Sequence, residues 1–119
     1  HTETPALSRM TIVVEGGIRV RYIGMNAPEM NEPWGEAAKE ANQALVQGKR
    51  VRLERDVSDT DRYGRWLRYV FADSLMVNGE LVRLGMAQAR HYPPDTKYQD
   101  YIDSLEQESR QAGRGIWAR

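Results

Sequence analysis

The sequence predicts an α+β domain whose main part is a small closed or partly closed β-barrel, with helices inserted among its strands. Short runs in which apolar and charged residues alternate are typical of half-buried strands, and several such runs occur here between glycine-rich or polar segments. The expected order is strands, a helix, more strands and then two helices, and short twisted strands with inserted helices suggest such a barrel. With 119 residues, the chain is about one domain and can bury a core.

The first two strands are predicted at residues 11–14 and 18–23, where a glycine-rich segment between them provides a hairpin turn. In the second strand the apolar residues alternate with Arg19 and Arg21, so the two arginines lie on the face opposite the apolar side chains. The residue before a proline favours an extended conformation, and we expect this strand to end at Pro28.

The middle of the chain predicts a helix, a strand, a loop and a further strand. Apolar residues recur at helical spacing over residues 34–47, and Gly48 is a good helix stop. A half-buried strand is expected at residues 50–54, followed by a polar loop at 56–64 and a strand at 66–72.

Two helices complete the predicted domain. Asn78 is expected to cap a short helix. Thr96 and Gln99 have the spacing of a capping box for the last helix, which should end at Gly113. We interpret the tryptophans first as packing anchors: Trp34, Trp66 and Trp117.

Composition limits the classes of function. The 17 basic residues equal the 17 acidic residues, which argues against a domain that coats nucleic acid by bulk charge but leaves room for a local basic site. There is no cysteine, so disulfides, thiolate zinc sites and cysteine catalysis are excluded. No apolar run approaches the ~18 residues of a membrane span. We expect the protein to be a monomer. The start at His1 fits a mature secreted or extracytoplasmic form, or a trimmed chain.

Three charged residues could form a site for phosphodiester chemistry. The guanidinium groups of Arg21 and Arg65 come from different segments and could clamp one phosphate, and the carboxylate of Glu29 could activate a water molecule. In the alternative interpretation, Arg65 pairs with Asp59 or Asp61 across the loop and Arg21 lies on a solvated strand face. The pattern alone favours this alternative.

Several segments together resemble the staphylococcal nuclease (thermonuclease) family over nearly the whole chain: VRYIGMNAPE, TDRYGR, MVN, GMA and the closing GIW, in this order and spacing. The resemblance implies a five-stranded OB-fold barrel with about three helices at residues 10–119, after an N-terminal tail at 1–9 that we expect to be disordered. It also implies a calcium-dependent phosphodiesterase that acts on single-stranded DNA or RNA, or that binds nucleotides.

The resemblance assigns roles to five residues. By position in the family's motifs, Arg21 and Arg65 correspond to the phosphate-binding arginines. Glu29 corresponds to the carboxylate that positions or activates the attacking water. Tyr63 lies in the loop that borders the nucleotide, and Tyr92 lies where a family tyrosine contacts the substrate.

The expected calcium site departs from the family pattern. Met10 stands at the position of one calcium-binding aspartate, and Asn26 stands at the position of the other. Calcium takes hard oxygen ligands and binds more tightly as carboxylates are added, whereas a thioether is a soft ligand. The formal charges of Glu29, Arg21 and Arg65 sum to a positive value, which favours phosphate over a divalent cation. We therefore expect a weakened calcium site.

Three hypotheses follow for the function. The first is an active nuclease whose metal site is degraded or rebuilt with another carboxylate such as Asp61, or with a different ion. The second is an inactive family member that binds nucleic acid or nucleotides through its arginines. The third is a module that binds a protein partner. The complete set of Arg21, Glu29 and Arg65 narrowly favours the first.

Overall fold

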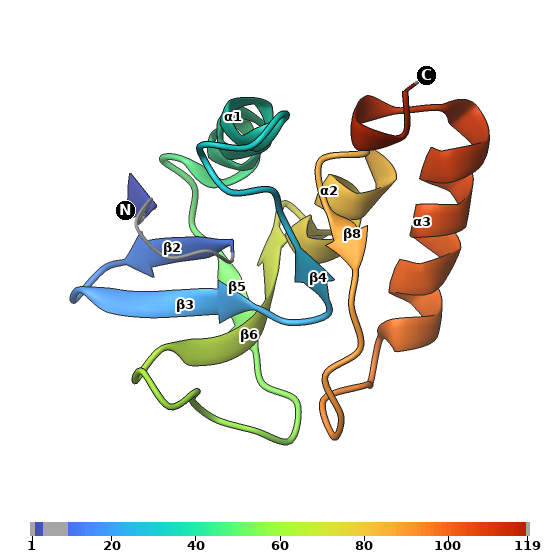
Figure 1. The fold of residues 1–119 in the computed structure, drawn as a ribbon. Coiled ribbons are helices and arrows are strands. Elements are labelled where there is room, and N and C mark those ends of the chain that lie inside the picture. Colours follow the sequence, from blue (N-terminus) through green and yellow to red (C-terminus); the bar gives the residue numbers. More distant parts are fainter. Residues whose placement is uncertain (1, 4–9, 119) are drawn as a thin grey trace.

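A mixed β-sheet flanked by helices forms the domain in the computed structural model, which describes residues 2–3 and 10–118 (Figure 1). Within these residues the elements follow in the order β1 (Thr2–Glu3), β2 (Thr11–Val14), β3 (Ile18–Tyr22), β4 (Met25–Asn26), α1 (Gly35–Val46), β5 (Arg52–Glu54), β6 (Trp66–Ala72), β7 (Leu75–Met76), α2 (Val77–Arg83), β8 (Gln88–Ala89), α3 (Gln99–Ala112) and the 3₁₀ turn η1 (Gly115–Trp117). The α+β class and the positions of the main strands and helices are as the alternation predicts.

The main sheet has the strand order β1-β2-β3-β6-β5, and β7 pairs with β6 off this path. The neighbours are antiparallel except β3 and β6, which run parallel with Val20 opposite Trp66. A second, antiparallel pair joins β4 to β8. The parallel pairing brings the end of the polar loop before β6 beside β3, although the two segments lie more than 40 residues apart in sequence.

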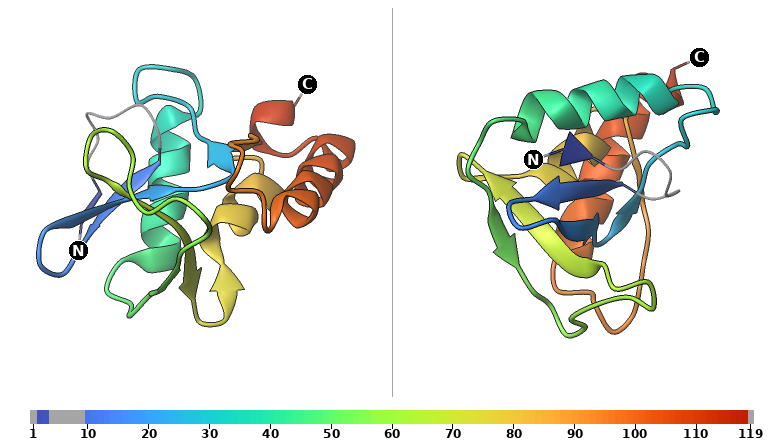
Figure 2. Two further views of the ribbon diagram at one scale, coloured as in Figure 1. Left: turned by 90° about the horizontal axis from the view of Figure 1, so that it is seen from below. Right: turned by 90° about the vertical axis from the view of Figure 1, so that its left-hand side faces the viewer.

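The helices enclose the core together with the sheet. Figure 2 shows α1 running across the strands, and α2 packs against α1, α3 and β6. The apolar cluster draws its fully buried side chains from both sheet and helices, including Ile12, Val20, Tyr22, Val70, Leu81 and Ile102. In the described part of the chain, no helix is both long and apolar enough to span a membrane.

The predicted tail falls mostly outside the described residues. Of residues 1–9, only Thr2–Glu3 are described, and they form β1 with Thr2 opposite Val13 of β2. The expectation of disorder for the remaining residues of this segment stays a prediction.

Asn78 does not cap α2, contrary to the sequence-based expectation. The helix begins at Val77, and the Asn78 side chain is fully buried. Its carbonyl oxygen accepts the N–H of Val70 at 2.8 Å, and its amide donates to the carbonyls of Ile23 at 2.9 Å and Arg68 at 3.3 Å. The core contains backbone groups of β6 and of the turn after β3 that need polar partners, and this demand outweighs the capping preference.

The predicted capping box and one predicted packing anchor are also wrong. The helix α3 begins at Gln99, so this residue cannot occupy the third position; its N–H donates to the Thr96 carbonyl at 3.1 Å and its side chain donates to Asp103 at 3.0 Å. Trp34 is 43% exposed and is therefore no buried anchor. Trp117 does pack back, with the guanidinium carbon of Arg110 4.0 Å from its ring centroid.

We expect Asn78→Ala to destabilise the fold by about 2–4 kcal/mol, because the buried N–H of Val70 and the Ile23 carbonyl lose their amide partner. The Arg68 carbonyl keeps the N–H of Ile23. Urea unfolding followed by tryptophan fluorescence measures the change. Asn31→Ala is the matched control, because Asn31 is exposed and should change stability by less than about 0.5 kcal/mol. Equal stability of the two variants would contradict the structural role of Asn78.

Candidate active site

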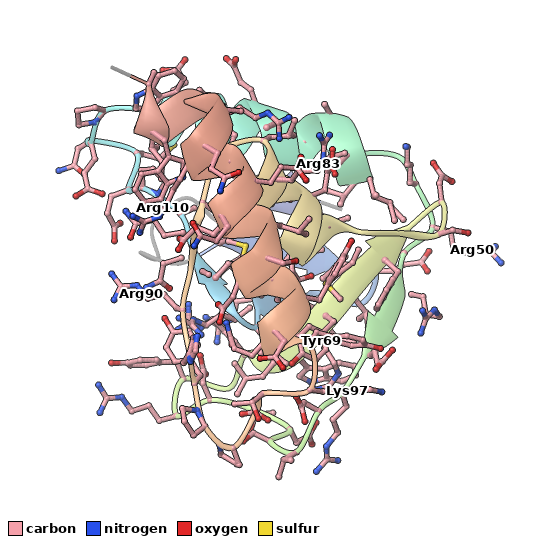
Figure 3. All side chains as sticks on the ribbon, turned by 90° about the vertical axis from the view of Figure 1, so that its right-hand side faces the viewer. Arg50, Tyr69, Arg83, Arg90, Lys97 and Arg110 are labelled. Carbon is pink, nitrogen blue, oxygen red and sulfur yellow. The ribbon has the colours of Figure 1, made fainter. Side chains whose placement is uncertain are left out.

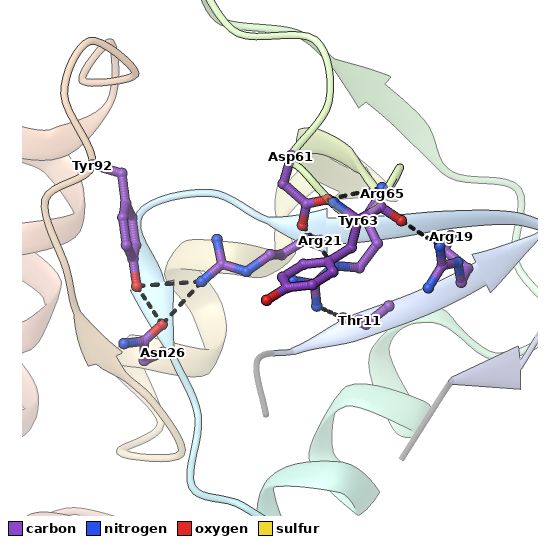
Figure 4. A network of polar contacts seen from close by, with 8 residues as sticks. All are labelled: Thr11, Arg19, Arg21, Asn26, Asp61, Tyr63, Arg65 and Tyr92. Atoms are coloured by element: carbon purple, nitrogen blue, oxygen red, sulfur yellow. Dashed lines mark hydrogen bonds and ion pairs between the residues drawn. The ribbon is translucent and has the colours of Figure 1, made fainter. Parts of the chain in front are cut away.

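Arg21 and Arg65 belong to one network of polar side chains: Arg21 extends toward Tyr92 and Asn26, and Arg65 lies between Asp61 and Thr11 (Figure 4). Thr11 of β2 lies directly opposite Arg21 of β3, so their side chains share a face. Arg65 precedes β6 and donates from Nη1 to the Thr11 hydroxyl at 3.4 Å. Both arginines are largely buried, which is unusual for arginine unless its donors find partners. The structure thus brings together the two arginines that the sequence proposed as a pair.

The loop before β6 holds Arg65 through one carboxylate. The Oδ1 atom of Asp61 accepts the backbone N–H groups of Tyr63 at 2.8 Å and Arg65 at 3.0 Å, and its Oδ2 accepts Nε of Arg65 at 2.6 Å. Gly64 has a φ of 79°, a left-handed conformation that glycine adopts without strain. The turn therefore fixes both the loop and the direction of the guanidinium group.

The electrostatics of this turn keep Asp61 ionised. Burial opposes its charge, but the backbone N–H groups and the guanidinium of Arg65 outweigh burial, so the pKa of Asp61 is held below its ordinary value. The alternative interpretation of the sequence expected Arg65 to pair with Asp59 or Asp61, and the structure contains the ion pair with Asp61. Asp59 pairs instead with Arg68, at 2.7 Å. Because Asp61 contacts Arg65 through Nε, the pair orients the guanidinium without covering all of its donors.

Arg21 is bound by an amide and a phenol. Its Nη2 donates to the Tyr92 hydroxyl at 3.3 Å and, at the longer distance of 3.5 Å, to Oδ1 of Asn26. The Tyr92 hydroxyl donates to the same Asn26 oxygen at 2.6 Å. The pairing of β4 with β8 and the bond from the Arg90 N–H to the Gly24 carbonyl, at 2.9 Å, carry the Tyr92 segment to this place. Tyr92 and Asn26 therefore lie beside Arg21.

Tyr63 forms the exposed edge of the arginine cluster. Its ring is 57% exposed, and the guanidinium carbons of Arg62 and Arg65 lie 5.1 and 5.6 Å from the ring centroid. Its carbonyl accepts Nη2 of Arg19 at 2.6 Å. Sequence reasoning did not assign Arg19 to the site. Its alternation with Arg21 in the same strand, which puts both side chains on one face, was the available signal.

Glu29 lies in the loop after β4. Its backbone N–H donates to Oε1 of Glu32 at 2.7 Å. It lines a cavity of about 450 Å³ together with Asn26, and the same cavity is bordered by Trp34 and by Arg90, which Figure 3 labels. Asn26 thus stands between the arginine cluster and the cavity that Glu29 lines.

The residues at the expected calcium positions do not fit a calcium ion as they stand. The side chain of Met10 is a thioether without an oxygen atom, and it is buried in the apolar core. The Asn26 oxygen already accepts the Tyr92 hydroxyl and Arg21. Among residues 2–3 and 10–118, no three histidine, cysteine or acidic side chains gather as a group that could hold a metal. Calcium requires six to eight oxygen ligands, and this donor set supplies too few.

The fold and the site define a small α+β domain, a mixed sheet with helices, that carries two largely buried arginines on one face of the sheet. Residues 19–119 match the family described as staphylococcal nuclease homologue, and the chain belongs to this family. The mixed sheet with three helices is consistent with the OB-fold architecture that the sequence resemblance implied.

Several relatives of this chain carry the names of nucleases. The chain is 37% identical over 107 residues to a thermonuclease of Staphylococcus intermedius, covering 85% of this chain and 64% of the relative. It is 36% identical to the endonuclease YncB of Bacillus subtilis, covering 84% of this chain and 51% of that protein. A probable staphylococcal-like nuclease of rice, CAN1, is 33% identical over 84% of this chain and 29% of its own length. The chain thus spans less than two thirds of each of these relatives.

We expect Asp61→Asn to lower stability at pH 7 by about 1–3 kcal/mol, because the guanidinium of Arg65 loses its charged acceptor. The folded-state pKa of Asp61 is depressed, so its contribution is complete above the unfolded carboxyl pKa of about 3.9 and is lost as the pH falls through the lower folded value. The difference between the two proteins should therefore shrink below about pH 4. Urea unfolding at pH 7 and at pH 3 measures this difference in stability.

Asp73→Asn is the matched control for this prediction. Asp73 pairs with Lys49 at 2.7 Å, but its side chain is 74% exposed, and exposed pairs contribute roughly 0–1 kcal/mol. A loss in Asp61→Asn that is the same at pH 7 and pH 3 would show that the charge of Asp61 is unimportant.

Proposed function

We propose that this chain is a phosphodiesterase that hydrolyses single-stranded DNA or RNA. The observation that carries the proposal is the position of Arg21 and Arg65 around Thr11, which lies opposite Arg21 in the sheet and accepts a hydrogen bond from Arg65; other side chains of the site hold both arginines. The nuclease names of its relatives support the same class of reaction. Its family is generally calcium-dependent, and whether this chain uses calcium is part of the proposal.

In this proposal the two arginines bind the scissile phosphate. Guanidinium groups bind phosphate oxygens bidentately through charge-assisted hydrogen bonds. Their charges stabilise the additional negative charge that develops on phosphorus-bound oxygens in the transition state. Prior orientation of Arg65 by Asp61 means that little side-chain freedom is lost when the phosphate binds.

Glu29 is the proposed general base. Its carboxylate would accept a proton from a water molecule as the water oxygen bonds to phosphorus and the bond to the leaving oxygen breaks. The leaving oxygen would take a proton from solvent. The position of Glu29 in the wall of a cavity that also includes Asn26 supports an approach of water from that side. Tyr63 and Tyr92 would contact the nucleotide at the edges of the arginine cluster.

The second candidate function is an impaired or inactive domain of this family that binds nucleic acid, a nucleotide or a protein partner. The burial of Met10 in the core and the hydrogen bonds to the Asn26 oxygen favour it, because both weaken a calcium site. A phosphate would still bind, since the guanidinium groups of Arg19, Arg21 and Arg65 outnumber the carboxylates of Glu29 and Asp61.

A fluorogenic single-stranded oligonucleotide tests the first candidate. We expect cleavage to fall in kcat/KM by roughly 10²–10⁴-fold in Arg21→Ala, Arg65→Ala and Glu29→Ala, because each variant loses a transition-state contact or the base. The assay is run with millimolar calcium and again with chelator. Arg50→Ala is the matched control: Arg50 is exposed and lies at the far side of the molecule from Arg90 (Figure 3).

Two results would count against the proposal. Cleavage that survives in both arginine variants would place the chemistry elsewhere. Absence of cleavage by the unaltered protein in both buffers would favour the second candidate, and oligonucleotide binding by the protein with both Arg21→Ala and Arg65→Ala would then separate nucleic-acid binding from a protein-binding role.

The metal position gives a separate prediction. We expect Asn26→Asp to raise calcium affinity by about tenfold or more, measured by calorimetry, because it adds a carboxylate at the entrance to the site. Met10→Asp in the same chain should strengthen binding further, although Met10 is buried and this change also costs stability. Asn31→Asp adds the same charge at an exposed position and should leave the affinity unchanged. No gain in Asn26→Asp would mean that Asn26 is not at the metal position.

A further inference from the structure

A cavity adjoins the candidate phosphate site, and of its walls only the side formed by Glu29 and Asn26 has a role in the proposed reaction. Its volume of about 450 Å³ lies within the range of small-molecule sites. Asn26 and Glu29 form the side toward the arginines, and Trp34, Gln88 and Arg90 are among the other lining residues. The pairing of β4 with β8 puts Asn26 opposite Gln88 and so builds one wall from the sheet.

Trp34 is held in an unusual conformation at the edge of this cavity. Its φ is 71° and its ψ is −1°, in the left-handed region that bulky residues rarely adopt. Its side chain is nevertheless 43% exposed, so burial does not account for the strain.

The loop that carries Trp34 is closed on itself. The N–H of Glu32 donates to the Glu29 carbonyl at 2.9 Å, and the N–H of Gly35 donates to the Glu32 carbonyl at 3.0 Å. A side chain at Gly35 would overlap the carbonyl of Glu29, so the two ends of the loop are in direct contact. These contacts therefore fix the backbone of Trp34 before any ligand binds.

The chemistry of the walls favours a neutral aromatic ligand over a second phosphate. Glu29 and Glu32 bring two carboxylates, against one guanidinium from Arg90. This balance disfavours an anion. An aromatic ring that can stack on an indole, with hydrogen-bonding groups at its edge for Gln88 and the charged residues, fits both the apolar and the polar parts of the cavity.

We propose that this cavity binds the base of a nucleotide adjacent to the scissile phosphate, with Trp34 as the stacking surface. The inference rests on the proposed function, because it takes Arg21 and Arg65 as the phosphate site. Figure 4 shows Arg21 between Asn26 on one side and the loop of Tyr63 on the other. A base in the cavity and a base at Tyr63 therefore lie on opposite sides of the phosphate. The substrate class is an oligonucleotide with a base on each side, and not a simple phosphodiester.

Binding of two matched single strands tests the inference: a short oligothymidylate and a strand of the same length whose sugars lack bases. Fluorescence anisotropy is measured in chelator, and the strands are checked afterwards for integrity. We expect Trp34→Ala to weaken binding of the base-bearing strand roughly tenfold, and binding of the abasic strand less than about twofold, because only stacking is lost. Trp34→Phe should retain most of the affinity.

The control variant and the contrary outcomes are defined by the same assay. Tyr101→Ala removes another exposed aromatic residue, on α3, and should change neither affinity. Thermal unfolding verifies that each variant is folded. Equal weakening of both strands by Trp34→Ala, or no weakening of the base-bearing strand, would overturn the inference.

A second variant separates this inference from the proposed function. The protein with both Arg21→Ala and Arg65→Ala should lose affinity for the abasic strand as well as the base-bearing strand. If it does and Trp34→Ala has no effect, the base site alone is wrong. If the double variant binds the abasic strand as tightly as the unaltered protein, the phosphate site is wrong whatever Trp34→Ala does.

Discussion

The parallel pairing of β3 with β6 is the constraint on which the site depends. Arg21 lies within β3, and Arg65 directly precedes β6, so this register is what brings the two guanidinium groups to one face. The buried amide of Asn78 stabilises the same arrangement, because it bonds to backbone groups of β6 and of the turn after β3. A side chain deep in the core thus supports the geometry of a site at the surface.

The two arginines are held by different chemistry. Arg65 has a carboxylate partner that also closes its own loop, so loop and guanidinium are fixed together. Arg21 contacts a phenol and an amide, which help to orient it. Counted formally, the guanidinium groups of Arg19, Arg21 and Arg65 outnumber the carboxylates of Asp61 and Glu29, so the cluster has a positive formal charge. An anion meets donors whose positions are already set, which lowers the entropic cost of binding.

Local patterns predicted much of this structure, and long-range contacts account for the rest. The alternation of apolar and polar residues predicted both ends of β6 correctly. The close spacing of Asp61 and Arg65 in the sequence made their ion pair one of the expected outcomes. The roles of Asn78 and Trp34 were misjudged because they depend on what packs around them: unpaired backbone groups for one, and a strained loop beside a cavity for the other. The bond from Arg19 to the Tyr63 carbonyl crosses 44 residues, and no local rule reports it.

Asn26 is shared by two neighbouring environments: its oxygen accepts hydrogen bonds from the Arg21–Tyr92 group, and the residue also borders the adjoining cavity. Anything that reorients this one amide changes both surroundings at once. Occupancy of either side would then alter affinity on the other, and linkage requires the two effects to be equal. If a ligand on one side reorients this amide, a single neutral side chain couples the two environments without any movement of the sheet.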